Sequence, residues 1–403
     1  MGSVTARKRG TKWEYRYEIA SQAGKRQWDT KGGFRTKAEA LEAGNVAYNE
    51  YKNSGLKFSP NNISVSDYLD YYYDTYCKIN LGDATLRNYE KKIRLYIKPF
   101  LGKYELQSLN ASVCQEFINH IFNEGYSKNS RIVIKSILNK ALNYAVEPLH
   151  YIRSNPLLYV RNPLPNAIPD KPVKKKVREA VTPEQWKAII ARFPEGSSCH
   201  VPLMLAYHCG LRLGEIFALT WDDIDFDNNK IDINKQIQME SSGYWTLCAP
   251  KYNSYRKIAM STTLSSLLKR EKAKQDKARP YYDEYYAHQY VNSQRQLIQD
   301  IQGYTVPEGG TEIFLINVRE NGTYCQPRIT QHLGRIVHYQ LGFPLFDMHS
   351  LRHTHCCMLL EEGAPIKFVQ QRLGHKDIET TLNIYAHLTD KMEEQGVEIL
   401  NKL

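Results

Sequence analysis

The stretch that decides the fold is HSLRHTHCCMLLEEGAPIKFVQQRLGHKDIETTLNIY, residues 349–385. Its first part predicts a helix in which His349 and Arg352 are three positions apart, so that their side chains share one face. The apolar residues that follow carry this helix on until Gly363 ends it. One helix face therefore presents an imidazole and a guanidinium together.

The second part of the stretch predicts two more helices. Pro365 suits the first turn of the next helix, and Gly374 suits the position just past its end. His375 should therefore lie beyond a helix terminus. Tyr385 follows ten residues later, within a helix predicted over residues 378–388. Three short elements thus deliver a basic side chain, two imidazoles and a phenol, and no single helix needs several of them for packing.

In this order, the His-x-x-Arg, Leu-Gly-His and Tyr series resembles the catalytic motifs of the tyrosine recombinases, the phage integrase family. Upstream, GLRLGE at 210–215 resembles the first motif of that family, whose arginine falls on Arg212. APK at 249–251, followed by RKI, resembles its β-hairpin lysine motif and places the lysine at Lys251. These motifs span about residues 180–390. The spacing between the last histidine and the tyrosine resembles that in integrases of Gram-positive phages and conjugative transposons.

The resemblance implies that these residues break a DNA phosphodiester bond without a metal ion or any other cofactor. Arg212 and Arg352 would bind the non-bridging oxygens of the pentavalent phosphorus, because a guanidinium is planar, bidentate and always charged. His375 would donate a further hydrogen bond to the same oxygens. Glu215, three residues after the first arginine, would orient an arginine or a histidine.

The other roles that the resemblance implies concern proton transfer. Tyr385 would attack the phosphorus, and its phenol, with a reference pKa of ~10, needs help to lose its proton. His349 is the expected assistant, and Lys251 would protonate the departing 5′ oxygen as general acid. The product would be a 3′-phosphotyrosine that keeps the bond energy, so rejoining needs no ATP.

Simpler interpretations of the same residues stay open at the level of sequence. Either arginine alone would more often be part of a surface ion pair, and Lys251 alone would be a solvated lysine in a turn. His349, His353 and Cys356 share helical spacing and could suggest zinc, but no fourth ligand or second paired motif accompanies them. His353 and His355 are expected to pack or to support their neighbours.

The length and composition limit the classes of protein to which the chain can belong. A length of 403 residues favours two or three domains, and 42% hydrophobic residues suit packed cores. Mean hydropathy is −0.54, and no apolar run approaches the ~18 residues that a membrane span needs. The basic N-terminus lacks the apolar core of a signal peptide, so we expect a cytoplasmic protein without membrane association. The eight cysteines are scattered, as is typical of reduced thiols.

The net charge of +11 is unevenly placed. Within residues 1–37, ten basic and three acidic side chains leave a net charge of +7. A nucleic-acid partner is the natural inference from such a segment. A solvated basic tail is the simpler alternative.

Residues 1–57 are predicted to fold as a small sheet with a helix. Trp13, Tyr15 and Tyr17 alternate with charged residues, as in a half-buried strand. A second strand is expected at 27–30, and Thr36 is the candidate N-cap of the helix that follows. This arrangement resembles the arm-type DNA-binding domains of larger integrases. The candidate DNA contacts in it are Arg16, Arg26 and Arg35.

Residues 64–165 are predicted to be helical, and the resemblance implies the family's core-binding, SAM-like domain. The candidate DNA contacts on one polar face are Lys128, Arg131 and Lys135, although any helical bundle carries such basic faces. Residues 166–180 are predicted to form a proline-rich linker across a phosphate backbone. The basic residues of this linker are Lys174, Lys175 and Lys176.

The catalytic domain is expected over residues 181–403. A β-hairpin is predicted around Asn228–Asn229. A second hairpin is predicted to pair residues 244–247 with 256–259 around the lysine turn. Residues 270–310, which are charged and rich in tyrosine, look like a family-variable insertion without an assigned role.

The sequence therefore predicts a multidomain α+β protein. It would comprise a small N-terminal sheet-plus-helix arm-binding domain, an all-α core-binding domain, and a mainly α catalytic domain with a small β-sheet. We expect a site-specific recombinase that integrates and excises a mobile element, as a homotetramer on double-stranded DNA with core and arm attachment sites. An excision factor or a host DNA-bending protein is an expected partner. The alternatives are a type IB topoisomerase, which the basic, aromatic N-terminal module argues against, and a DNA-binding regulator on a recombinase scaffold.

Overall fold

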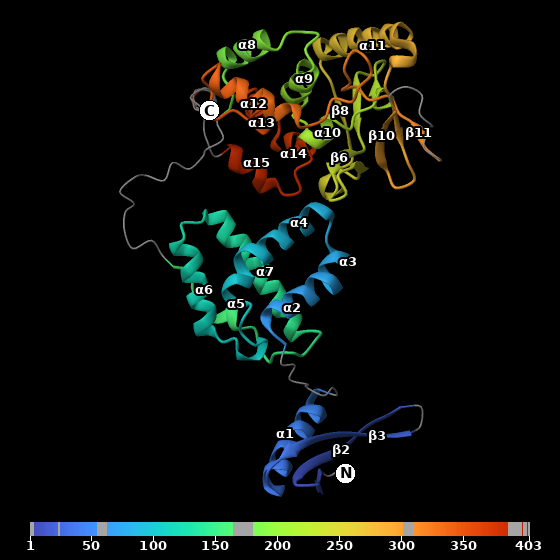
Figure 1. Ribbon diagram of the computed structural model, residues 1–403. Helices are drawn as coiled ribbons and strands as arrows, with labels where there is room; N and C mark the ends of the chain where they lie inside the picture. The colour runs from blue at the N-terminus through green and yellow to red at the C-terminus, as the bar shows by residue number, and fades with distance from the viewer. Residues whose placement is uncertain are drawn as a thin grey trace. The chain divides into compact units, whose positions relative to one another are not determined.

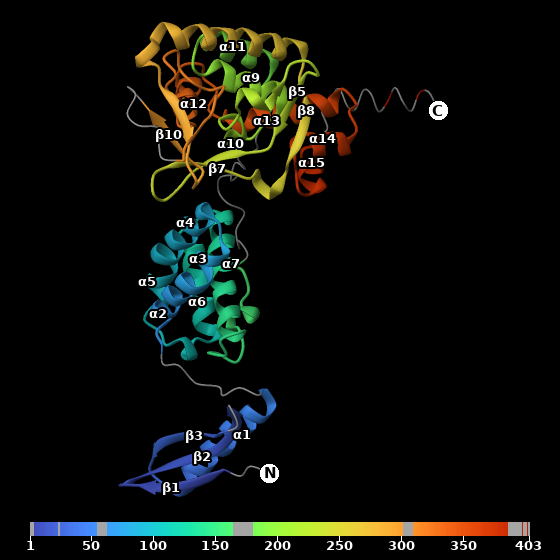
Figure 2. The same ribbon diagram turned by 90° about the vertical axis from the view of Figure 1, so that its right-hand side faces the viewer.

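The computed structural model describes residues 4–22, 25–54, 63–163, 180–300 and 309–385, with the single residues 397 and 401 (Figure 1, Figure 2). The side chains of residues 20–27, 50, 52–54 and 383–385 also lie outside the described part. The chain divides into two compact units, residues 1–170 and 171–403. Among the described residues, no helix is both long enough and apolar enough to cross a membrane.

The N-terminal residues form one antiparallel sheet and one helix, as predicted. The elements are β1 (Thr5–Arg9), β2 (Lys12–Gln22), β3 (Lys25–Phe34) and α1 (Lys37–Ser54), with strand order β1-β2-β3. Tyr15 and Tyr17 are buried, and the ring centroid of Tyr17 lies 5.5 Å from that of Tyr48 on α1. The alternation along β2 therefore predicted its buried face. The Thr36 hydroxyl accepts a hydrogen bond from the N–H of Glu39 at 3.2 Å, which is the contact expected of an N-cap.

The second part of the first unit is helical, also as predicted. Its helices are α2 (Val65–Tyr72), α3 (Lys78–Asn80), α4 (Asp83–Lys92), α5 (Lys98–Leu101), α6 (Ala111–Asn123) and α7 (Lys128–Val146). π-Helical turns at Tyr73–Cys77 and Ile93–Ile97 continue α2 and α4. Short 3-10 turns cover Leu106–Ser108 and Pro156–Tyr159. Side-chain oxygens of Ser64, Asn110 and Ser127 cap α2, α6 and α7, which fixes where these helices begin.

Helices provide more of the regular structure of the second unit than strands do. They are α8 (Pro183–Arg192), α9 (His200–Cys209), α10 (Leu213–Ile216), α11 (Thr262–Tyr282), α12 (Ile329–Tyr339), α13 (Met348–Glu361), α14 (Ile366–Leu373) and α15 (Ile378–Tyr385). Most residues of α9 are buried, and this helix packs against α13 at the centre of the core. Thr182 and Gln185 form a capping box at the start of α8. Pro365 stands immediately before α14, one position earlier than predicted, and Gly374 ends that helix as predicted.

Two small antiparallel sheets complete the second unit. One has the strand order β4-β5-β8 and contains β4 (Ile224–Asp225), β5 (Lys230–Ile233) and β8 (Arg256–Ala259). The other has the order β11-β9-β10-β7-β6 and contains β6 (Gln236–Met239), β7 (Trp245–Cys248), β9 (His288–Val291), β10 (Gln296–Asp300) and β11 (Thr311–Glu312). The pairing of β4 with β5 confirms the hairpin predicted around Asn228–Asn229.

The second predicted hairpin is wrong. β7 pairs with β6 and β10, whereas β8 pairs with β5 in the other sheet. Between β7 and β8 the chain makes a 3-10 turn at Lys251–Asn253, in which Tyr252 and Asn253 have φ of 62° and 53°. These left-handed residues turn the chain out of one sheet and into the other. β7 instead finds its partner in β6, which precedes it by a short turn at Gly243 with φ of 89°.

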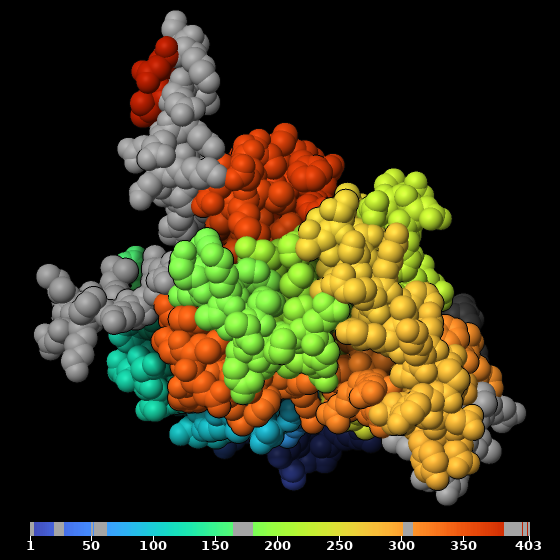
Figure 3. All heavy atoms as spheres, turned by 90° about the horizontal axis from the view of Figure 1, so that it is seen from above, coloured from blue at the N-terminus to red at the C-terminus, as the bar shows by residue number. Residues whose placement is uncertain are grey.

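The described residues of the segment 270–310 are 270–300, 309 and 310, and residues 270–300 form regular elements of this unit. α11 begins before this segment, where it buries Leu264, Leu267 and Leu268 in the main core, and it continues into the segment as far as Tyr282. Figure 3 shows this helix in gold across the outer surface. β10 pairs with β7 through Gln296 and Leu297 and so extends the sheet. The described part of the segment therefore contributes β9, β10 and the larger part of α11 to the fold.

Candidate active site

Two helices of the second unit end side by side in left-handed glycines. Gly210 ends α9 with φ of 65°, and Gly374 ends α14 with φ of 66°. A Cβ on Gly210 would lie 2.6 Å from Leu373 Cδ2, so the close approach of these helix ends requires glycine. The carbonyl oxygens at such ends carry partial negative charge and are suited to bind cations.

Arg352, on α13, binds both helix ends. Its Nη1 donates to Gly210 O at 2.7 Å and its Nη2 donates to Leu373 O at 2.6 Å. Only 3% of the residue is exposed. Burial, and then the charge of Arg212, lower the pKa of Arg352 to about 9, which still leaves it charged at neutral pH. The guanidinium is thus fixed in place and positive.

Arg212 precedes α10 and reaches the same two segments. Its Nη1 donates to Glu215 Oε1 at 2.8 Å and to Ser254 Oγ at 3.1 Å, and its Nη2 donates to Gly374 O at 2.5 Å. Within the described residues, these bonds engage three of the five N–H groups that a guanidinium offers. Two N–H groups remain for oxygens of a bound anion.

Glu215 is wholly buried between Arg212 and Arg256. Arg256 donates from Nη1 to Oε1 at 3.1 Å and from Nη2 to Oε2 at 2.8 Å. Oε2 also accepts from the backbone N–H of Arg212 at 2.9 Å. Burial alone would raise the pKa of Glu215, but hydrogen bonds and charge from Arg256, and then Arg212, lower it below its ordinary value. The carboxylate is therefore ionised at neutral pH and forms ion pairs with both arginines.

His375 lies immediately past α14, as expected. Its Nδ1 is 2.9 Å from the hydroxyl of Thr381, which is completely buried on α15. Burial, followed by the charges of Arg352 and Arg212 and then of His349, lowers the pKa of His375 to about 3. This imidazole is neutral at physiological pH and therefore carries a single N–H.

Lys251 lies on the turn between the two sheets, and its side chain is exposed. Its Nζ is 5.1 Å from the ring centroid of Tyr252, and Lys376 Nζ is 5.8 Å from the same ring. The lysine turn therefore lies against the segment that follows His375. Together with the Ser254 contact to Arg212, this brings the turn to the cluster.

The last two predicted catalytic residues are His349 and Tyr385. His349, at the start of α13, is exposed and is near enough to His375 to interact with it electrostatically, so it lies at the edge of the cluster. The backbone of Tyr385 ends α15, while its side chain lies outside the described part. The structure thus brings Arg212, Arg352, His375, Glu215 and the lysine turn together.

Residues 179–392 match the protein-family model of the phage integrase family. The chain belongs to the phage integrase family. Residues 64–122 match the N-terminal SAM-like domain of phage integrases, and residues 3–45 match an arm DNA-binding domain. The protein is a tyrosine site-specific recombinase that binds DNA and serves integration and excision of a mobile element. The three-part fold predicted from the sequence is that of this family.

Relatives cover nearly the whole chain. A XerC-like tyrosine recombinase of Caldanaerobacter subterraneus is 27% identical over 92% of this chain and 90% of its own length. The ICEBs1 integrase of Bacillus subtilis is 24% identical over 91% of this chain and 90% of its own length.

Solved structures share the fold. The Tn1549 transposon integrase in complex with transposon right-end DNA has a TM-score of 0.62 at 21% identity, covering 84% of this chain and 100% of its own. A λ integrase tetramer bound to a Holliday junction has a TM-score of 0.53 at 18% identity, covering 96% of this chain and 95% of its own.

Arg372 and His355 form a second group of hydrogen-bonded basic side chains in the catalytic domain, which the sequence did not predict. Arg372 Nε donates to Nε2 of the buried His355 at 3.0 Å, and His355 Nδ1 is 2.9 Å from Tyr207 O. Burial, and then the charge of Arg372, lower the pKa of His355 to about 3. His355 is thus a neutral bridge that joins α9, α13 and α14, as its expected supporting role requires.

The zinc alternative finds no support in the part of the chain that the structure describes. His349 is exposed, and His353 Nε2 lies 3.8 Å from Cys357 Sγ. No group of three His, Cys, Asp or Glu side chains within the described residues is arranged to hold a metal ion. All eight cysteines are free thiols, and Cys356 is buried.

The proposed DNA contacts of the N-terminal sheet differ in their surroundings. The Arg16 guanidinium lies 5.0 Å from the ring centroid of Trp28, an indole that is 44% exposed. Arg35 is exposed beside Glu39, which accepts its backbone N–H at 2.9 Å. The side chain of Arg26 lies outside the described residues. Arg16 and Trp28 therefore form an aromatic and basic patch on the face of the sheet that α1 leaves open.

The helical domain places its three candidates along α7. Lys128 is exposed, and the Arg131 guanidinium lies 4.5 Å from the ring centroid of Phe122. Lys135 Nζ donates to Val160 O at 3.2 Å and to Asn162 Oδ1 at 2.9 Å, so the chain itself already binds this ammonium. The linker residues Lys174, Lys175 and Lys176 lie outside the described residues.

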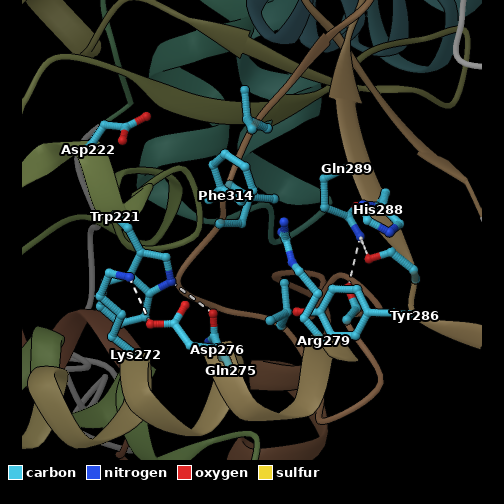
Figure 4. A pocket seen from close by; sticks show the side chains of 15 residues that line it. Trp221, Asp222, Lys272, Gln275, Asp276, Arg279, Tyr286, His288, Gln289 and Phe314 are labelled. Carbon is cyan, nitrogen blue, oxygen red and sulfur yellow. Dashed lines mark hydrogen bonds and ion pairs between the residues drawn. The ribbon is translucent and has the colours of Figure 1, made fainter. Parts of the chain in front are cut away.

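A cavity of about 330 Å³ lies between α11 and β9 (Figure 4). Trp221 Nε1 donates to Gln275 Oε1 at 2.8 Å on one side, and the Arg279 guanidinium lies 4.5 Å from the ring centroid of Phe314 on the other. In both ribbon views α11 and α15 lie at opposite edges of the unit (Figure 1, Figure 2). None of the predicted catalytic residues lines this cavity, so it is separate from the candidate active site.

Proposed function

We propose that Tyr385 is the nucleophile of strand cleavage and that Arg212, Arg352 and His375 bind the scissile phosphate. The observation that carries this proposal is the meeting of two guanidiniums at the glycine ends of α9 and α14, next to a neutral imidazole. Fixed donors of this kind stabilise charge that develops on phosphate oxygens in the transition state.

In the proposed reaction, the oxygen of Tyr385 attacks the phosphorus and loses its proton to His349. The bond from phosphorus to the 5′ oxygen breaks, and Lys251 gives that oxygen a proton. The products are a 3′-phosphotyrosine and a free 5′ hydroxyl. Attack by the 5′ hydroxyl of another strand reverses the same steps and rejoins the DNA without ATP.

His375 acts as a hydrogen-bond donor rather than as a cation in this scheme. Its low pKa leaves one N–H at neutral pH. We assign His375 the tautomer in which Nδ1 accepts the hydrogen of the Thr381 hydroxyl, 2.9 Å away, and Nε2–H donates to a phosphate oxygen. The positive charge at the phosphate is then supplied by the two arginines.

We also propose that different domains of the chain bind different DNA sites. Residues 1–57 bind arm-type sites, residues 64–165 and 181–403 bind and cut the core site, and residues 166–180 link them. The matches to an arm DNA-binding domain and to a SAM-like domain support this division. The patch of the half-buried Arg16 and the exposed Trp28 suits DNA binding as well.

We also propose that the active form is a homotetramer on double-stranded DNA in the cytoplasm. The support is the likeness in fold to the λ integrase tetramer bound to a Holliday junction. An excision factor or a host DNA-bending protein sets the direction of the reaction.

Covalent trapping on a nicked suicide substrate tests these roles. Arg212→Ala and Arg352→Ala should bind attachment-site DNA within a few-fold of the wild type but cleave it about 100-fold or more slowly, because donors to the transition state are lost. Cleavage by both variants at the wild-type rate would contradict the proposed phosphate site.

A further inference from the structure

Arg256 joins three segments that carry the proposed catalytic residues. It begins β8, directly after the lysine turn, and only 8% of its side chain is exposed. Its two Nη atoms bind both carboxylate oxygens of Glu215, its Nη1 also binds Ser254 O at 3.1 Å, and its Nε binds Arg372 O at 2.8 Å. One side chain thus contacts the Arg212 segment, the lysine turn and the last turn of α14.

The geometry of these bonds requires a guanidinium. Two parallel N–H groups meet the carboxylate of Glu215, while the Nε–H points to Arg372 O. A lysine has a single nitrogen and cannot reach all three acceptors at once. At Gly374, a Cβ would lie 3.1 Å from Arg256 Nη1, so the turn that presents His375 packs directly on this guanidinium.

The charge of Arg256 also determines how Arg212 is used. Glu215 is wholly buried, so its negative charge must be compensated by its neighbours. With Arg256 bound to both carboxylate oxygens, Arg212 needs to give only Nη1 and its backbone N–H to Glu215. Without Arg256, the guanidinium of Arg212 would be the remaining cation in contact with this carboxylate and would be drawn further toward it.

We propose that Arg256 is a positioning residue for strand cleavage. It neutralises Glu215, which leaves N–H groups of Arg212 available for the phosphate, and it holds the Lys251 turn and the His375 turn in register. Arg256 does not itself contact the DNA in this scheme. The inference rests on the roles proposed above for Arg212, Lys251 and His375.

The test compares Arg256→Lys and Arg256→Gln with a control on the same strand, Lys257→Ala. The Lys257 side chain is 71% exposed, and its ammonium lies 3.8 Å from Asp232, so its loss should change little. Each variant is measured for thermal unfolding, for binding to attachment-site DNA, and for single-turnover cleavage of a nicked suicide substrate. A second substrate carries sulfur in place of the 5′ bridging oxygen.

Cleavage of the oxygen substrate should fall about 100-fold in Arg256→Gln and about 10-fold in Arg256→Lys, because small misplacements of catalytic groups carry penalties of this size. DNA binding should stay within a few-fold of the wild type, and the Lys257→Ala rate should be unchanged. The sulfur substrate should recover part of the loss. A thiol, with a reference pKa of ~8.5, departs without the proton that Lys251 supplies.

Wild-type cleavage by Arg256→Lys would overturn the positioning role. An equal loss of cleavage on the oxygen and sulfur substrates would also overturn it. The same holds if cleavage falls only in proportion to the amount of folded protein. Mapping the wild-type DNA adduct tests the catalytic roles separately. A normal Arg256→Lys rate beside an adduct on Tyr385 therefore overturns the positioning role alone.

Discussion

Replacing Glu215 by glutamine should destabilise the second unit strongly. The buried carboxylate accepts four hydrogen bonds, at 2.8 and 3.1 Å on Oε1 and at 2.9 and 2.8 Å on Oε2. Glutamine keeps one acceptor oxygen and turns an amide group toward the other pair of donors, so two bonds are lost. Charge-assisted bonds contribute about 1.5–3 kcal/mol each. We therefore expect the free energy of unfolding to fall by about 3–5 kcal/mol, the range for a broken buried ion pair.

The same substitution should slow strand cleavage by about 100-fold, because Arg212 and Arg256 would repel each other without the carboxylate between them. Urea unfolding and suicide-substrate cleavage measure the two effects. The exposed Glu320 offers a matched control, and Glu320→Gln should change the free energy of unfolding by less than about 0.5 kcal/mol. A Glu215→Gln protein as stable and as active as this control would refute the reasoning.

The stabilisation by Glu215 should also depend on pH. Its pKa is lowered in the folded protein, so its contribution is fully present above the unfolded pKa of ~4.3 and is lost as pH falls through the folded value. The difference in unfolding free energy between wild type and Glu215→Gln should therefore be largest at neutral pH and shrink below about pH 4. A difference that stays constant down to pH 3 would contradict this account.

Three further predictions follow from the same geometry. Thr381→Val should slow cleavage about 10-fold because His375 loses the hydroxyl at its Nδ1, and Thr381→Ser should restore it; equal rates for both variants would exclude this role. Cleavage should persist in excess EDTA, whereas its abolition by EDTA and rescue by zinc would revive the metal site. A protein that lacks residues 1–57 should still cut core sites but recombine full-length sites poorly, and full recombination would contradict the proposed division.

Local signals in the sequence predicted much of this structure. Gly374 marks a helix end because its φ of 66° suits glycine, and Thr182 marks a helix start because its hydroxyl caps the N3 N–H. Alternation placed Tyr15 and Tyr17 on the buried face of β2. Each of these features depends on residues that are close in the chain.

Features that depend on distant residues were missed. β1 has the sequence TARKR, in which no apolar alternation announces a strand, and it forms by pairing with β2. The second hairpin was predicted wrongly because the sequence pattern does not show which strands pair. β7 pairs with β6, and β8 pairs with β5. The strands β9 and β10 within the predicted insertion could be recognised only through the pairing of β10 with β7.

The candidate site divides in the same way. Motif resemblance singled out Arg212, Arg352 and His375, and the fold brings these residues together. Arg256 begins the RKI that follows the lysine motif, but no role was predicted for it, and Thr381 carries no motif signal. The significance of both lies in bonds to Glu215 and His375 that only the fold creates. The spacing of Arg212 and Glu215 indicates one ion pair, whereas the second partner, Arg256, is 41 residues away and meets the carboxylate only in the fold.

The identity of the nucleophile is the central claim, and adduct mapping tests it most directly. Wild-type protein is trapped on a nicked suicide substrate and digested, and the peptide that retains the nucleotide is then sequenced by mass spectrometry. Tyr385→Phe is the matched control. We expect an adduct on Tyr385 in the wild type, and DNA binding without any adduct in Tyr385→Phe. An adduct on another residue, or one that persists in Tyr385→Phe, would contradict it.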